Sequence, residues 1–221
     1  MKSSVVAWVA VSVWVSLLGS GCGGGGNGPV GFNVGGASMC GVVAPCGGNV
    51  VGTWTASVGC VTSAGLRQAE SGITCSGFSL SVTNVSVSGT FTFNADMTYS
   101  FTGLSEQAMY QISAPVGCVA GHSCASAATG IESTGEFDSA SCTGVSTCTC
   151  SAVQTPIVDT ESGTYTLSGT TFTTFPRNGL PTSTLPYCVE GTNLHILATV
   201  TPSLGAMGQM VVEEDTVAQK Q

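Results

Sequence analysis

Apolar and polar residues alternate along much of the chain, and the clearest example lies between residues 85 and 93. Apolar side chains there fall on one face of an extended segment, and serines and threonines fall on the other. These apolar residues are Val85, Val87, Phe91 and Phe93. A period of two is typical of a half-buried strand, in which Gly89 allows a bend or bulge. Turn-forming residues 94–97 follow, and Tyr99 and Phe101 resume the alternation, so the pattern predicts a β-hairpin.

Similar short segments recur on both sides of this hairpin. A β-branched run over residues 49–58 contains Trp54 and predicts the first strand. Further strands are predicted over residues 108–115, 150–158, 163–167, 170–175, 187–189, 194–200 and 210–217. About eight to ten short strands at hairpin spacing indicate an all-β antiparallel barrel or sandwich. The side chains expected to share one interior with Trp54 are Val85, Val87, Phe91, Phe93, Tyr99, Phe101, Tyr165, Leu167, Leu194 and Ile196.

The alternating pattern stops between residues 118 and 150. Five cysteines crowd into this segment, and serine, alanine and glycine dominate the rest of it. There is room for one short helix near residues 125–134. We therefore interpret residues 118–150 as a Cys-rich loop insertion that disulfides hold in place.

The N-terminal residues have the organisation of an export signal. The apolar run from Val5 to Leu18 is shorter than the ~20 residues that a membrane span needs, and small residues follow it. Residues 1–21 are therefore predicted to be a cleaved signal peptide. The small residues before Cys22 resemble the bacterial lipobox, which implies that Cys22 carries a diacylglycerol and anchors the protein in the membrane. The alternative is ordinary secretion with Cys22 as a spare thiol.

The cysteine count agrees with lipidation. Eleven cysteines are an odd number for an exported chain, and removing Cys22 leaves ten, which can all pair in an oxidising compartment. Ten cysteines allow about 945 connectivities; among them we favour only the local pairs Cys40–Cys46 and Cys142–Cys148. The ten residues expected to form disulfides are Cys40, Cys46, Cys60, Cys75, Cys118, Cys124, Cys142, Cys148, Cys150 and Cys188.

Composition excludes some classes of partner. Only 7% of residues are charged and the formal net charge is −8, so the polar surface must consist of serine, threonine, glycine and asparagine. The basic residues left after signal cleavage are Arg67, Arg177 and Lys220. Nucleic-acid binding needs clustered lysine and arginine and is therefore not expected. Membrane attachment must come from acyl chains, and the glycine-rich residues 22–45 form a tether behind them.

Several short motifs, taken in order, resemble those of bacterial lipocalin-like lipoproteins over residues 46–221. They are Gly52-Thr53-Trp54, the hairpin from Thr92 to Tyr99, Gly163-Thr164-Tyr165 and the closing hairpin from Tyr187 to Leu194. The resemblance implies an up-and-down barrel, location in the bacterial cell envelope at the outer membrane, and Trp54 stacked on a late basic residue, for which Lys220 is the candidate. It also implies a small apolar ligand inside the barrel; the alternative is a packed barrel that works as a structural or interaction protein. The residues expected to bind such a ligand are Trp54, Phe91, Phe93, Tyr99, Phe101 and Tyr165.

Signals for chemistry are few. No catalytic or nucleotide-binding motif occurs, so we expect neither an enzyme nor a cofactor. His122 lies between Cys118 and Cys124, and zinc bound there with Cys148 and Cys150 is the alternative to disulfides. The acidic run over residues 213–215 suggests calcium, but alternate side chains of a strand point to opposite faces, so a solvated edge is the preferred interpretation. His195 is expected at the surface.

Overall fold

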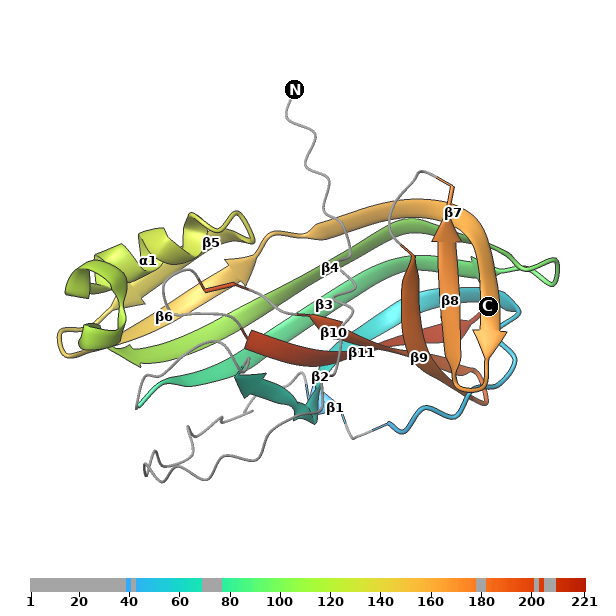
Figure 1. The fold of residues 1–221 in the computed structure, drawn as a ribbon, viewed down its shortest axis with the longest axis horizontal. Helices are drawn as coiled ribbons and strands as arrows, with labels where there is room; N and C mark the ends of the chain where they lie inside the picture. The colour runs from blue at the N-terminus through green and yellow to red at the C-terminus, as the bar shows by residue number, and fades with distance from the viewer. Residues whose placement is uncertain (1–38, 41–42, 69–76, 178–181, 201–202, 205–209) are drawn as a thin grey trace, which may run out of the picture.

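In the part of the chain that the structure describes, strands predominate and one α-helix interrupts them (Figure 1). This computed structural model describes residues 39–40, 43–68, 77–177, 182–200, 203–204 and 210–221. The helix is α1 (Cys124–Glu132), and two 3-10 turns, Val116–Cys118 and Ala120–His122, precede it. The strands are β1 (Met39–Cys40), β2 (Gly52–Gln68), β3 (Ser79–Phe93), β4 (Thr98–Pro115), β5 (Phe137–Thr143), β6 (Thr147–Gln154), β7 (Ile157–Ser168), β8 (Thr171–Pro176), β9 (Ser183–Glu190), β10 (Asn193–Val200) and β11 (Met210–Lys220).

Eight of these strands close into an antiparallel barrel. The ring runs β2-β11-β10-β9-β8-β7-β4, and β3 pairs with both β4 and β2 to complete it. Strands that are neighbours in the barrel are consecutive in the chain except at two places: β7 follows β4 after the insertion, and β11 closes on β2. The predicted all-β, up-and-down antiparallel barrel is thus confirmed, and the sandwich alternative is wrong.

The strand predicted over residues 108–115 is not separate but is the second half of the long strand β4. The pairing of β4 with β7 shifts register between Phe101 and Leu104, and that of β3 with β4 shifts between Ser88 and Thr90. Gly89 has a φ of +119°, and a Cβ built there would lie 2.6 Å from Leu104 Cα. Only glycine allows the two irregular segments to approach this closely. β4 therefore continues past a bulge instead of ending at it.

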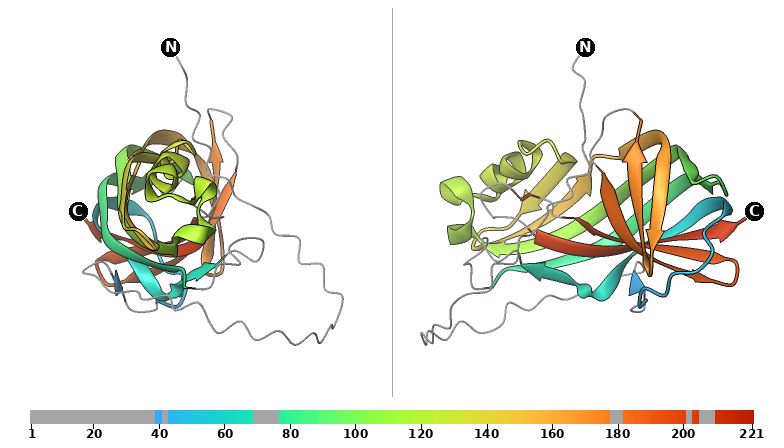
Figure 2. Two further views of the ribbon diagram at one scale, coloured as in Figure 1. Left: turned by 90° about the vertical axis from the view of Figure 1, so that its left-hand side faces the viewer. Right: turned by 45° about the vertical axis from the view of Figure 1, so that its right-hand side comes forward.

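The insertion contains regular strands, contrary to the prediction of a loop. β6 pairs with the second half of β4, β5 pairs with β6, and α1 lies in front of the barrel opening in the end view (Figure 2, left). The predicted helix is present at Cys124–Glu132, where the Ser123 hydroxyl caps it by accepting a hydrogen bond from Ser126 N at 3.1 Å. Among the described helices, none is long and apolar enough to cross a membrane.

The buried apolar residues form two clusters rather than the single interior that the sequence predicted. The helix-side cluster joins α1 and the insertion to the first half of β3 and the second half of β4, and it includes Phe78, Leu80, Val82, Val85, Tyr110, Ile112, Ile131 and Phe137. The aromatic cluster fills the opposite part of the barrel and consists of Val50, Trp54, Ala56, Phe91, Phe93, Tyr99, Leu104, Tyr165, Phe172, Tyr187, Leu194, Ile196 and Ala218. Trp54 is completely buried, as predicted. Val87 and Phe101 are partly buried against the aromatic cluster, Val85 belongs to the other cluster, and Leu167 is 39% exposed, so its predicted inward position is wrong.

Three disulfides are described, and none matches the local pairs suggested from the sequence. Cys46 bonds to Cys188, Cys124 to Cys148, and Cys142 to Cys150. The pairs Cys40–Cys46 and Cys142–Cys148 are therefore wrong. The reason is strand register: Cys142 and Cys150 are direct partners on β5 and β6, whereas Cys148 points toward α1. Cys60 and Cys118 are also disulfide-bonded.

Several sequence predictions fall outside the described residues. These are the signal peptide over residues 1–21, the lipidated Cys22, the tether before residue 39 and the disulfide of Cys75. The side chain of Cys40 is likewise outside the description. Within the predicted tether, Met39–Cys40 forms β1, which pairs in parallel with Val61 and Thr62 of β2.

Candidate functional site

A small cavity lies inside the barrel beside the aromatic cluster. Its volume is about 50 Å³, which is room for a few water molecules or for a ligand of a few non-hydrogen atoms. Pockets that hold drug-sized molecules measure roughly 300–1,000 Å³. The wall is formed by Phe91, Phe101, Leu104, Glu106, Glu161, Phe172, Thr174, Ser183, Leu185, Ile196, Ala198 and Thr216. The cavity is thus mostly apolar, with two carboxylates in its wall.

The bulge in β4 places one of these carboxylates inside. Tyr99 is inward-facing before the bulge, whereas Leu104, Glu106 and Ala108 are buried after it, so the inward side changes from odd to even positions. A shift of one residue moves every following side chain to the other face of a strand. Glu106 consequently shares the inner face with apolar residues.

A second glutamate, Glu214 on β11, lies next to Glu106 inside the barrel. Glu214 is inward-facing on β11, opposite the cavity-wall residue Ala198 on β10, and is 3% exposed. Burial raises the pKa of Glu214 well above its ordinary value, and the charge of Glu106 and a hydrogen bond to it act in the same direction. Glu214 in its protonated form therefore donates a hydrogen bond to Glu106. Its Oε1 atom is buried and has no hydrogen-bond partner.

Tyr110 stands near the two glutamates on the helix side. Its ring packs edge-on against Phe137 with centroids 5.8 Å apart, and its hydroxyl is buried without a hydrogen-bond partner. Burial raises the pKa of Tyr110 well above its ordinary value, and the charges of Glu214 and Glu106 add to this effect. Buried polar atoms are nearly always paired in proteins. The Tyr110 hydroxyl and Glu214 Oε1 are therefore two buried polar atoms without partners that lie close together, between the two apolar clusters.

The second carboxylate of the cavity wall is held by a tyrosine. Glu161 is buried on β7, and the Tyr99 hydroxyl donates a hydrogen bond to Glu161 Oε1. Tyr99 also packs against Phe101, with ring centroids 4.8 Å apart. The aromatic cluster thus fixes the orientation of Glu161 at the cavity.

The six residues predicted to bind an apolar ligand all lie in or against the aromatic cluster, but the cavity reaches only two of them. Phe91 and Phe101 line it, and their rings meet edge to face at 5.1 Å. The other four, Trp54, Phe93, Tyr99 and Tyr165, are buried in the cluster and do not line the cavity. Most of the predicted ligand site is therefore filled by its own side chains.

Trp54, at the start of β2, contacts the end of the last strand, β11. Its indole nitrogen donates a hydrogen bond of 2.7 Å to Val50 O, and Lys220 Nζ lies 5.2 Å from the ring centroid. Lys220 and Trp54 are direct partners where β11 pairs with β2. The stacking of the first-strand tryptophan on a late basic residue is thus present, with Lys220 as the cation.

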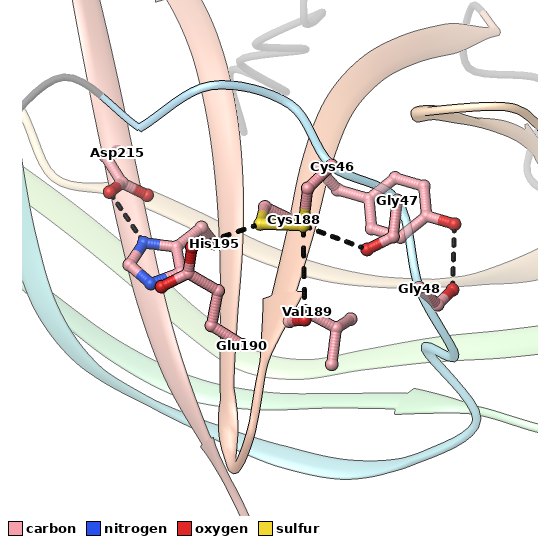
Figure 3. Close-up of a disulfide and its surroundings, with 9 residues drawn as sticks. Cys46, Gly47, Gly48, Cys188, Val189, Glu190, His195 and Asp215 are labelled. Carbon is pink, nitrogen blue, oxygen red and sulfur yellow. Dashed lines mark hydrogen bonds and ion pairs between the residues drawn. A yellow bond between two sulfur atoms is a disulfide. The ribbon is translucent and has the colours of Figure 1, made fainter.

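A separate polar group lies on the outer face of the barrel (Figure 3). His195 Nδ1 is 2.8 Å from Asp215 Oδ2, and the Cys46–Cys188 disulfide lies beside this pair (Figure 3). His195 is a direct strand partner of Cys188. Burial raises the pKa of Asp215, and the hydrogen bond from His195 opposes that effect. Because Cys188 is oxidised, it supplies no thiolate to this pair.

The acidic run over residues 213–215 is not a solvated edge. Glu214 and Asp215 are both buried, one inside the barrel and the other on its outer face beneath His195. The prediction that adjacent carboxylates would point to opposite faces holds. The prediction of exposure is wrong because Glu214 faces the barrel interior and Asp215 contacts the His195 side chain on the outer face.

The cysteines that the zinc alternative needs are engaged in disulfides. Cys124 and Cys150 bond to Cys148 and Cys142, and Cys118 is also disulfide-bonded. Within the described residues, no group of three or more His, Cys, Asp or Glu side chains is placed to hold a metal ion.

Sequence reasoning missed Glu106 and Glu214, although a signal for both is present. Glu106 falls in register with Leu104, Ala108 and Tyr110, and Glu214 falls in register with Val212. A carboxylate in phase with apolar residues indicates an inward charge. Glu106 was missed because it falls between the predicted hairpin and the strand predicted from Ala108, and Glu214 was missed because the acidic run over residues 213–215 was interpreted as a solvated edge.

Fold and site together define a closed eight-stranded antiparallel barrel with a small acidic cavity. Comparison with protein-family models, with curated proteins and with solved structures finds no match to this chain.

Proposed function

We propose that the protein is a non-enzymatic, lipocalin-like lipoprotein of the bacterial cell envelope that holds a small ligand inside its barrel. The observation that carries this proposal is the cavity of about 50 Å³ inside the barrel, beside the aromatic cluster. A barrel of eight strands is just wide enough to be filled by side chains or to hold one small ligand. The stacking of Lys220 on Trp54 supports the lipocalin-like assignment.

The attachment of the chain to the barrel fits a lipid-anchored protein. The proposed anchor is Cys22, and the chain is fixed at Cys46 by its disulfide to Cys188 on β9. Backbone hydrogen bonds extend this attachment: Val189 N donates to Gly47 O at 2.8 Å, and Cys46 N donates to Tyr187 O at 3.1 Å. A pull on the tether therefore acts on a covalently fixed point of the barrel.

A packed barrel without a ligand is the second candidate, and the size of the cavity favours it. The space is far below that of a drug-sized pocket, and four of the six predicted ligand residues are buried away from it. In that case the insertion and the serine- and threonine-rich surface would be the functional parts.

Native mass spectrometry of protein taken directly from cells separates the two candidates. A ligand-binding barrel retains an added mass, and Ala198→Leu, which fills the cavity wall, abolishes it. The matched control is Ala125→Leu on the exposed side of α1, which should retain the added mass. Wild-type protein that carries no added mass and binds no small probe in vitro would favour the second candidate, a packed barrel without a ligand.

The intact mass of the cell-associated protein tests the anchor. We expect a chain that begins at Cys22 and carries acyl groups, and a Cys22→Ser variant that is released in soluble form. A wild-type protein with an unmodified Cys22 would refute the lipoprotein assignment.

A further inference from the structure

The cavity is acidic in an otherwise apolar setting. Glu106 and Glu161 are in its wall, and Glu214 adjoins Glu106 through a hydrogen bond. Among the side chains that the structure describes, no lysine, arginine or histidine is inside the barrel: Arg177 and Lys220 are exposed, and His195 is on the outer face. The Glu106–Glu214 pair therefore lacks a described counter-charge.

The pair also has unused hydrogen-bonding capacity. Glu214 Oε1 is buried on the inner side of β11 without a partner, next to Thr216 in the cavity wall. Leaving a buried acceptor unpaired costs roughly 1–3 kcal/mol, and burying an unpaired carboxylate costs more. A hydrogen-bond donor with a positive charge would satisfy Oε1 and stabilise the buried negative charge of the pair.

Aromatic rings also line the cavity. Phe91, Phe101 and Phe172 line the cavity, and aromatic faces attract cations while their apolar surface accepts alkyl groups. Calcium and magnesium are bound by several carboxylate and other oxygen ligands, and within the described residues no three or more Asp, Glu, His or Cys side chains are placed to hold a metal ion. A wall that combines carboxylates with phenyl rings suits a cation that carries apolar groups.

We propose that the barrel cavity binds a small organic ammonium ion, whose N–H groups donate hydrogen bonds to Glu106 and Glu214 and whose alkyl part packs against the phenylalanine rings. This inference rests on the proposed function, since it names the ligand class of the same cavity. The volume of about 50 Å³ is smaller than the ~150 Å³ of a cavity that admits benzene. The ligand is therefore an alkylamine of a few carbon atoms rather than an aromatic amine.

The test is a titration of the mature protein with n-propylamine, which is cationic at neutral pH, and with 1-propanol, which has the same shape without the charge. Ligand-observed NMR suits the weak binding that so small a probe allows. We expect propylamine to bind at least about tenfold more tightly than propanol. Glu106→Gln removes the charged acceptor, and Glu214→Gln replaces a carboxyl that can release its proton beside a bound cation by an amide that cannot. Each should therefore weaken propylamine binding by about tenfold or more. Asp138→Asn, on the exposed side of β5, changes net charge equally and should leave binding unchanged.

The outcomes separate this inference from the proposed function. Equal binding of propylamine and propanol, or propylamine binding that survives in both folded glutamine variants, would overturn the ammonium site and leave a carrier of neutral ligands. Calcium or magnesium that binds stoichiometrically and displaces propylamine would also overturn it, in favour of a metal site. If wild-type protein binds neither probe, both the inference and the ligand-binding function fail. Circular dichroism of each variant confirms that it is folded.

Discussion

Replacing Glu214 with glutamine tests whether the fold keeps this carboxyl neutral. Glu214 is 3% exposed, and its pKa is raised well above the ordinary 4.5 by burial first and by Glu106 second. In the unfolded chain the carboxyl loses its proton near pH 4.5, whereas the folded protein retains it to a higher pH. Stability from this group is therefore fully present below about pH 4.5 and is lost as pH rises through the folded-state pKa.

The size of the effect follows from proton linkage. One proton retained by the folded state changes the free energy of unfolding by at most about 1.4 kcal/mol per pH unit. Between pH 5 and 7, this group alone can lower the stability of the wild-type protein by up to about 2–3 kcal/mol. Glutamine has nearly the same shape, keeps a hydrogen-bond donor toward Glu106 and does not titrate. The Glu214→Gln variant should therefore lose this part of the pH dependence and gain stability relative to wild type as pH rises.

Urea unfolding at a series of pH values from 5 to 8, at constant ionic strength, measures this difference. The Asp138→Asn variant controls for the change in net charge, and its profile should run parallel to that of wild type. Parallel profiles for wild type and Glu214→Gln would refute the reasoning, because they would mean that Glu214 titrates alike in the folded and unfolded states. A variant whose stability relative to wild type falls with rising pH would refute it as well.

Three further predictions concern the packing around the site. Trp54→Ala should lower the free energy of unfolding by ~3–5 kcal/mol, since the buried indole is lost; a nearly neutral effect in urea unfolding would refute its place in the core. Tyr110→Phe should be neutral or stabilise the protein by ~1 kcal/mol, because its hydroxyl has no partner. Tyr187→Phe is the matched comparison and should cost ~1 kcal/mol, because that hydroxyl donates to a backbone oxygen at 3.0 Å; equal effects of the two substitutions would contradict this. Replacing Cys46 and Cys188 together by serine should cost ~2–5 kcal/mol, as the bridge spans 142 residues, and thermal unfolding with an unchanged midpoint would argue against the bridge.

The barrel could be predicted from the sequence because buried and exposed side chains alternate regularly over most of the length of its strands. In the hairpin of β3 and β4, Phe91, Phe93 and Tyr99 are buried as the alternation predicts, and the turn at residues 94–97 is present. Strand order then follows from short connections, since neighbouring strands in an up-and-down barrel are consecutive in the chain. Local patterns therefore suffice wherever the pairing is regular.

Alternation no longer predicts which side chains are buried where the sheet is irregular. The bulge after Phe101 changes which side of β4 faces inward, and nothing in the alternation before it shows by how many residues the register shifts. The pairing of cysteines fails for a related reason: Cys46 meets Cys188 only because the segment before β2 runs beside β9. Contacts between residues 142 positions apart depend on the closed barrel and not on local spacing.

The positions of the missed glutamates bear on whether the cavity is a binding site or a packing defect. Among the acidic side chains that the structure describes, Glu106, Glu161, Glu214 and Asp215 are buried. Asp215 contacts His195 and Glu161 accepts a hydrogen bond from Tyr99, whereas Glu106 and Glu214 contact each other. A barrel filled for stability alone gains more from an apolar residue at positions 106 and 214, since replacing buried ionisable pairs by apolar side chains is often neutral or stabilising. Ionisable groups that are buried at a cost in stability concentrate at functional sites. Glu106, placed at the cavity by a bulge that only glycine permits, and Glu214 beside it therefore favour a barrel that binds a cation over one that is merely incompletely filled.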